Sequence, residues 1–412
     1  MRSLPLLLLA PALAAAEPLP VPVSRAAAES LLILEAAGDY KGSAFSIGGG
    51  TLATVNHNVE DGAGKPRTGS MDVLLGPAPV AKGPVVVRRS RFYDLALLRV
   101  PVGSAGQGAV APLALAPDAS VKAGDVVYPI GGSSGATRLR VTHAGGAPVF
   151  LGVADGERGC DSGDSGGPVL DAAGRVVGVV DFTGTWGGKT TVGVLRADLL
   201  ARLARGEPLP EAFPEAPADA ASAFLWGEFA QKSGALDASV RLLRRAVELA
   251  PADAQLRVAL GLSHERRREL GLAAAQHRKA SQLAPEAPEP YLELGRVASR
   301  RGEPQDALRL YAQAAKASPR YPLAPYNSGV VRQELGQFEA AIADFRRALE
   351  LTPRGSAMAD AALRSIVQCH ALKGDMIRAW ETVAEWKSAG GVPDGPLLDW
   401  LGRGAAAPGR RP

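Results

Sequence analysis

Proline recurs at a fixed interval in the second half of the chain. Pro251, Pro285, Pro319 and Pro353 are each separated by 34 residues. Three other sets of positions keep the same interval: Gly227, Gly261, Gly295 and Gly329; Ala246, Ala280, Ala314 and Ala348; and the larger residues Leu243, His277, Tyr311 and Phe345. Glycine and alanine let paired helices approach closely, and proline ends the second helix of each pair. The period therefore predicts a solenoid of stacked helix pairs.

This pattern resembles the tetratricopeptide repeat. The resemblance implies four repeats and a degenerate fifth unit of capping helices, at 218–251, 252–285, 286–319, 320–353 and 354–390. Stacked repeats of this kind present a concave groove, which implies a protein partner. The arginines of "RLLRRAVE", "HERRREL" and "DFRRALE" either favour acidic tails or form solvated helix faces. The last segment, 402–412, is expected to be disordered.

The first half of the chain has a different residue pattern from the repeats. Residues 25–204 contain many short, β-branched runs divided by glycine or proline, a pattern typical of an all-β sandwich or barrel. The proline- and alanine-rich stretch 205–217 then predicts a semi-extended linker. We therefore expect a multidomain protein, with an all-β domain followed by an all-α solenoid.

The N-terminus has the layout of a secretory signal peptide. Arg2 gives a positive start, Leu4–Leu13 is apolar, and Ala14–Ala16 offers small residues for cleavage after Ala16. We expect residues 1–16 to be removed and the protein to be secreted or periplasmic. The alternative is a disordered tail. No later stretch is long and apolar enough to span a bilayer, so stable membrane insertion is not expected.

Charge and cysteine content narrow the expected ligands. The net charge of +4 is too small to indicate a nucleic-acid partner. Cys160 and Cys369 fall in different predicted domains, so they lack a zinc-binding spacing, and a disulfide between them is possible only in an oxidising compartment. We expect no metal or organic cofactor.

A glycine-rich stretch with two acids, "GCDSGDSGGPV" at 159–169, contains the candidate nucleophile Ser165. Serine needs a neighbouring base, and only His57 and His143 lie in the β-rich half. His57 follows the apolar strand of "TLATVNHNV", whereas His143 has no supporting context. Asp94, at the start of "DLALLRV", either orients an imidazole or pairs with a nearby arginine. The glycines around Ser165 permit a sharp turn in which the amides of Gly163 and Ser165 converge on an oxyanion.

These motifs resemble the trypsin-like superfamily of serine peptidases, closest to its HtrA-like branch. "GSAF", "TLATVNHNV", "DLALLRV", "GDSGGPV" and "TVGVLRADLL" carry the resemblance over roughly residues 25–200. It implies two six-stranded barrels with His57 as general base, Asp94 as its orienting carboxylate and Ser165 as nucleophile. It also implies an oxyanion hole formed by Gly163 and Ser165, and protein or peptide substrates. The alternative is an envelope adaptor whose peptidase-like domain is latent or inactive.

Two residues depart from the family pattern. Asn58 follows the histidine, where the family has a small or β-branched apolar residue. Asp164 lies where the HtrA-like branch commonly has asparagine. In digestive-type relatives the matching aspartate pairs with a new N-terminus, but here we expect a local arginine or backbone donors as partners. The predicted substrate pocket comprises Gly159, Cys160, Asp161, Asp181 and Phe182. Glycine at 159 favours small or apolar side chains at the cleavage site.

Overall fold

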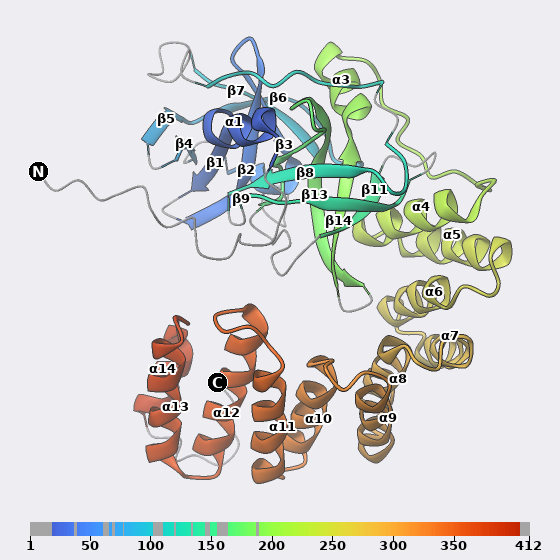
Figure 1. The fold of residues 1–412 in the computed structure, drawn as a ribbon, viewed down its shortest axis with the longest axis vertical. Coiled ribbons are helices and arrows are strands. Elements are labelled where there is room, and N and C mark those ends of the chain that lie inside the picture. Colours follow the sequence, from blue (N-terminus) through green and yellow to red (C-terminus); the bar gives the residue numbers. More distant parts are fainter. Residues whose placement is uncertain are drawn as a thin grey trace, which may run out of the picture. The chain divides into compact units, whose positions relative to one another are not determined.

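The computed structural model describes residues 19–36, 39–60, 66–67, 71–76, 78–101, 110–118, 121–132, 135–144, 149–154, 164–186 and 189–403. The chain divides into two compact units, Met1–Gly234 and Ala235–Pro412. Strands dominate the first unit and helices make up the second (Figure 1). Within the described ranges, no helix combines the length and the apolar character needed to cross a bilayer.

The first sheet has seven antiparallel strands in the order β5-β4-β1-β2-β3-β7-β6. They are β1 (Leu31–Ala36), β2 (Asp39–Gly48), β3 (Thr51–Val55), β4 (Met71–Leu75), β5 (Ala78–Lys82), β6 (Val85–Ser90) and β7 (Leu95–Arg99). Alternate side chains of a strand point to one face, so Leu32 and Leu34 of β1 are both buried in the core. β7 is buried from Leu95 through Leu98, which explains its continuous apolar run.

The second sheet also has seven strands, in the order β10-β11-β14-β13-β12-β8-β9. They are β8 (Val126–Gly131), β9 (Gly135–Ala136), β10 (Leu139–His143), β11 (Val149–Ala154), β12 (Pro168–Leu170), β13 (Val176–Trp186) and β14 (Lys189–Arg196). A further pairing of β10 with β8 closes this sheet into a barrel around Phe150, Val180 and Val194. Among the described residues the first sheet stays open between β5 and β6. The expected pair of barrels is therefore seen as one closed barrel and one open, barrel-like sheet.

In the described part of the first unit there are also four helices: α1 (Val21–Glu29), α2 (Asn56–Val59), α3 (Ala197–Arg205) and α4 (Ala220–Lys232). α3 ends at Gly206, whose φ of 77° is the left-handed conformation that glycine adopts readily at a helix C-terminus. The proline-rich segment after it lies against the turn between β6 and β7. There Tyr93 Oη donates to the Pro210 carbonyl at 2.5 Å, and Ser90 Oγ donates to Glu211 Oε1 at 2.6 Å. This segment leads the chain from α3 to α4.

The second unit consists of α5 (Leu236–Leu249), α6 (Ala254–Arg266), α7 (Leu270–Leu283), α8 (Pro288–Arg300), α9 (Pro304–Ala317), α10 (Leu323–Glu334), α11 (Phe338–Glu350), α12 (Ala357–Leu372), α13 (Met376–Ser388) and α14 (Gly395–Gly402). The division after Gly234 places α4, which the sequence assigns to the first repeat, in the first unit.

The repeated glycines sit where consecutive helices pack most closely. A Cβ added at Gly295 in α8 would collide with the Tyr311 ring of α9. The same holds for Gly261 against His277, and for Gly329 against Phe345. In these three repeats the small and the large positions therefore face one another. Together with the β-rich first unit, this confirms the expected fold class.

Candidate active site

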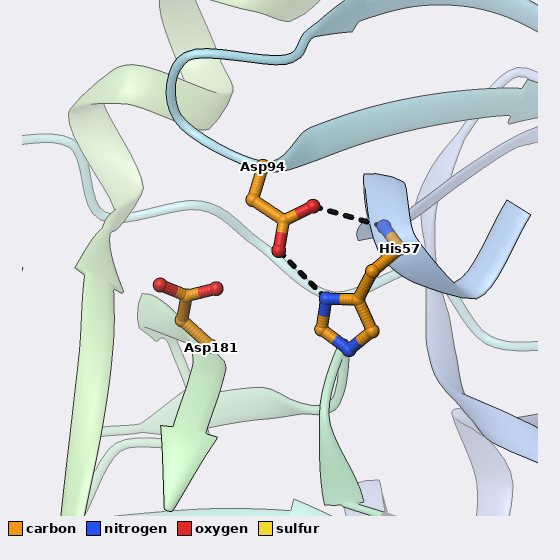
Figure 2. A group of neighbouring side chains, drawn as sticks. All are labelled: His57, Asp94 and Asp181. Carbon is orange, nitrogen blue, oxygen red and sulfur yellow. Dashed lines mark hydrogen bonds and ion pairs between the residues drawn. The ribbon is translucent and has the colours of Figure 1, made fainter. Parts of the chain in front are cut away.

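His57 and Asp94 form the centre of the site. His57 lies on the short helix α2, directly after β3, and Asp94 lies in the turn before β7. The ring Nδ1 of His57 lies 2.6 Å from Asp94 Oδ2, and the His57 amide donates to Asp94 Oδ1 at 2.9 Å (Figure 2). Two hydrogen bonds to one carboxylate fix its orientation. The ring edge that carries Nε2 faces away from Asp94, and 45% of the histidine side chain is exposed.

The backbone of Asp94 is held in an unusual conformation. Its φ is 54°, in the left-handed region that non-glycine residues rarely adopt. Its carbonyl accepts a 2.7 Å hydrogen bond from the Asn56 amide, at the first residue of α2. The neighbouring Arg91 pairs with Glu60 instead of with Asp94. The turn thus aims the carboxylate at α2, and the alternative pairing of Asp94 with Arg91 is not seen.

Ser165 is 5% exposed and lies in the turn before β12. Its Oγ donates to the Asp181 carbonyl at 3.3 Å, and no hydrogen bond joins it to His57 within the described residues. The turn depends on Gly166, whose φ is 89°. A Cβ there would lie closer than 3.0 Å to the Ser43 carbonyl, so only glycine fits. The sequence correctly placed a sharp glycine turn here, but the serine hydroxyl has a different partner from the expected one.

Asn58 connects the histidine helix to the serine turn. It is fully buried, and its Nδ2 donates to the Ser165 carbonyl at 2.8 Å and to Thr54 Oγ1 at 3.0 Å. The same Ser165 carbonyl accepts from the Ser43 amide of β2 at 2.9 Å. The sequence marked Asn58 only as a departure from the family. Its position beside the candidate base could have indicated this role, because an amide side chain can hydrogen-bond backbone groups and an apolar side chain cannot.

A lysine that the sequence analysis did not identify enters the site from α4. Lys232 Nζ donates to Asp94 Oδ2 at 2.9 Å and also pairs with Asp181 Oδ1. Asp181, on β13, is 1% exposed and lies beside His57 and Asp94 (Figure 2). Asp181, which was expected in a substrate pocket, therefore directs its carboxylate at Lys232. No motif in the sequence connects Lys232 with Asp94, 138 positions away, or with Asp181, 51 positions away.

The two carboxylates have different electrostatic surroundings. Burial tends to raise the pKa of Asp94, but the hydrogen bond from His57 and the Lys232 charge outweigh it and lower this pKa to about 2. Asp94 is thus an ionised acceptor, so the proton between it and His57 belongs to Nδ1. Burial raises the pKa of Asp181 to about 6 despite the Lys232 charge. Burial opposes ionisation of Lys232, but Asp181 and Asp94 together raise its pKa.

Several predicted site residues lie outside the described residues: Gly159, Cys160, Asp161 and Gly163. Phe182 belongs to β13, but its side chain is outside the described part as well. Asp164 is fully buried and packs against Gly131. His143 packs against Phe224 of α4, with 5.1 Å between ring centroids. Cys369 is a buried free thiol in the second unit.

Among the described residues, two groups of side chains have the composition of metal sites. His57, Asp94 and Asp181 place one potential ligand atom each within 4.8 Å of the others, and so do Glu265, His277 and Glu293. In the first group the ammonium of Lys232 already pairs with both carboxylates. In the second, Glu265 and Glu293 pair with Arg300 and Arg296. In both groups the carboxylates thus pair with cations of the chain, whereas Asp181 Oδ2 and His277 Nδ1 have no hydrogen-bond partner among the described residues.

Comparison with known families identifies both parts of the chain. Residues 42–179 match the model of the trypsin-like peptidase domain, and residues 292–356 match that of the tetratricopeptide repeat. No curated protein sequence matches the chain.

Two solved structures illustrate the two likenesses. The active form of the Rv3671c protease from M. tuberculosis is 26% identical, covering 46% of this chain and 86% of that one, with a TM-score of 0.36. YrrB, described as a TPR protein with an unusual peptide-binding site, is 18% identical, covering 45% and 92%, with a TM-score of 0.36. By the family matches, residues 42–179 form a trypsin-like peptidase domain and residues 292–356 form tetratricopeptide repeats.

Proposed function

We propose that this protein is an exported serine endopeptidase that hydrolyses peptide bonds with His57, Asp94 and Ser165. The observation that carries the proposal is the pair of hydrogen bonds from His57 to Asp94, at 2.6 and 2.9 Å. They hold the imidazole in the tautomer whose Nε2 can accept a proton. The glycine turn that presents Ser165 is tied to the same helix through Asn58.

The proposed reaction proceeds through an acyl-enzyme. Ser165 Oγ attacks the scissile carbonyl carbon while His57 Nε2 takes its proton, and the imidazolium is stabilised by Asp94. The histidine then gives that proton to the leaving amine, which departs and leaves an acyl-enzyme. Water, deprotonated by the same Nε2, releases the acid product and restores the serine. Backbone amides of Gly163 and Ser165 would hold the developing oxyanion.

A second function is favoured by the partner of the serine hydroxyl. Ser165 Oγ donates to the Asp181 carbonyl rather than to His57, so the nucleophile is not activated in this arrangement. A latent peptidase-like domain on an envelope adaptor would have such a site. Catalytic hydrogen bonds are commonly longer or misaligned without substrate. In an active peptidase the Ser165 side chain would rotate toward His57 when substrate binds, whereas in a latent domain it would stay on the Asp181 carbonyl.

The remaining parts of the proposal concern location and partners. The signal-like segment 1–16 supports export to the periplasm or the medium, with cleavage after Ala16. The repeats support recruitment of a protein substrate or a regulatory protein partner. The second unit contains a hollow of about 510 Å³ between α11, α12 and α13, lined by residues of both charge signs such as Arg354 and Asp360. Such a lining suits a polar peptide segment.

Labelling of the purified full-length protein with a fluorophosphonate tests the proposal directly. This probe reacts with activated serines, so wild type should be labelled, Ser165→Ala unlabelled and His57→Ala labelled far more slowly. Ser281→Ala, which alters a serine whose hydroxyl bonds only within its own helix, is the matched control and should behave as wild type. Persistent labelling of Ser165→Ala would refute the assignment of the nucleophile. Absence of labelling in every form would favour the latent adaptor.

A further inference from the structure

Helix α4 is seated on the peptidase unit by a cluster of aromatic rings. Phe229 of α4 packs on Phe92 and Tyr93, with ring centroids 5.6 and 5.7 Å apart. Phe213 of the proline-rich segment lies 4.9 Å from Phe92, and Trp226 of α4 lies 6.0 Å from Phe229. Phe92 and Tyr93 immediately precede Asp94 in the chain. This packing fixes α4 against the turn that carries the carboxylate.

The last residue of α4, Lys232, extends from this contact into the site. Its ammonium bonds both Asp94 and Asp181, and only 25% of its side chain is exposed. The contact to Asp94 is made at Oδ2, the oxygen that also accepts from the His57 ring. Lys232 therefore shares the atom through which Asp94 acts on the histidine.

The cluster needs a cation to hold two carboxylates together. Lys232 pairs with Asp94 from the turn before β7 and with Asp181 from β13, and His57 from α2 lies against both acids. Asp181 is buried and like-charged with Asp94, so without Lys232 the two acids repel. Without the cation, both negative charges act on the imidazolium and stabilise it. Their mutual repulsion also displaces the Asp94 carboxylate that orients His57.

We propose that Lys232 is a positioning residue of the peptidase site, which sets the orientation and effective charge of Asp94 and makes catalysis depend on the seating of α4. The inference rests on the proposed peptidase function. Lys232 touches neither the substrate nor Ser165 in this role; it acts through Asp94. Asp181 is its counter-charge, so the two residues form one compensated pair.

The pair predicts pH shifts of opposite sign in the full-length protein. Lys232→Met removes a positive charge and stabilises the imidazolium, so the acid limb of the labelling rate moves to higher pH by about one unit. Asp181→Asn leaves an extra positive charge and moves the limb to lower pH. Both single variants should slow labelling at the plateau roughly 10- to 100-fold, because the carboxylate is misplaced. In the double variant neither position 232 nor position 181 is charged. Its acid limb should return to the wild-type pH, and part of the labelling rate should be recovered.

Lys279→Met, at an exposed position of α7, is the matched control and should leave both the rate and the limb unchanged. A wild-type limb and rate in folded Lys232→Met would overturn the proposal, as would shifts of the same sign in the two single variants.

A second readout separates failure of this inference from failure of the peptidase function. The proton on His57 Nδ1 gives a downfield NMR signal when it is hydrogen-bonded to a carboxylate, and it can be followed in Ser165→Ala without any turnover. We expect Lys232→Met to move or broaden this signal and the double variant to restore it. If wild type is never labelled, the peptidase proposal fails, and this signal alone decides on Lys232: an unaltered signal in Lys232→Met overturns its positioning role.

Discussion

The peptidase unit and the repeat unit are built from contacts of very different range. In the repeats, Gly295 meets Tyr311, 16 positions later, and the same spacing joins Gly261 to His277 and Gly329 to Phe345. In the peptidase unit, contacts at the site join residues far apart in the chain. Asn58 bonds Ser165 across 107 positions, and Lys232 bonds Asp94 across 138.

This difference decides how each unit responds to substitution. A repeat array is stabilised by each repeat and its nearest neighbours, so a local defect stays local. The peptidase site is assembled from the turn before β7, the helix α2, the strand β13 and the helix α4. One altered side chain there changes several partners at once. Substitutions in the two units should therefore differ in kind: loss of activity in the first unit, and loss of stability in the second.

The largest effect is expected at the most connected residue of the site. Asp94→Asn keeps the size of the side chain but removes the charge that stabilises the imidazolium and favours the Nδ1–H tautomer. Fluorophosphonate labelling of Ser165 should slow about 10⁴-fold while the fold is kept. Asp118→Asn, an exposed acid of the same unit, is the control. A loss of less than tenfold at Asp94 would mean that His57 does not depend on this carboxylate.

The next effect tests the connection between the two halves of the site. Asn58→Leu keeps the volume but removes the hydrogen bond to the Ser165 carbonyl, which retains the bond from the Ser43 amide. Labelling should slow roughly 10- to 100-fold because the nucleophile is displaced. The loss of stability should be about 1 kcal/mol by urea unfolding.

Asn327→Leu in α10, where the amide bonds only a carbonyl of its own helix, should leave the labelling rate unchanged. Equal rates for the two variants would show that Asn58 only fills space.

The sequence predicted what rests on local patterns and missed what rests on tertiary packing. The 34-residue period predicted the paired helices of the repeats and their small and large positions. The pattern of short β-branched runs predicted the β-rich unit. The motif residues His57 and Asp94 were brought together as expected. Asn58 and Lys232 could not be assigned roles, because their partners are defined only when distant strands and α4 meet. Asp181 was expected in a substrate pocket. Its partner Lys232 lies on α4, which the sequence assigns to the repeats, and nothing in the sequence connects the two residues.

A smaller effect is expected within the repeats. Gly295→Ala places a methyl group against the Tyr311 ring, and overpacking of this kind costs about 1–3 kcal/mol. Gly271→Ala in α7 is the matched control, because nothing lies within 4 Å of the added carbon. It should be neutral or stabilise the helix by up to about 1 kcal/mol. Urea unfolding followed by helical circular dichroism measures both. If Gly295→Ala also slowed labelling of Ser165, the separation between local repeats and a cooperative site would fail.

The smallest effect is the pH dependence contributed by Asp181. Burial raises its pKa from 3.8 to about 6, so between these values the folded protein binds more protons than the unfolded chain. Stability contributed by this group therefore falls as the pH rises through that interval. Asp181→Asn removes the dependence, so its thermal midpoint relative to wild type should rise by a few degrees on going from below pH 3.8 to above pH 6.

Asp94→Asn should show the opposite trend. The pKa of Asp94 is lowered to about 2, so its contribution is present above its ordinary pKa of 3.8 and is lost as the pH falls toward 2. Its variant should lose most relative to wild type at neutral pH and least in acid. Opposite trends in the two variants would show that burial governs the pKa of Asp181, whereas His57 and Lys232 govern the pKa of Asp94. Parallel trends would mean that the two carboxylates share one environment, and that Lys232 does not distinguish between them.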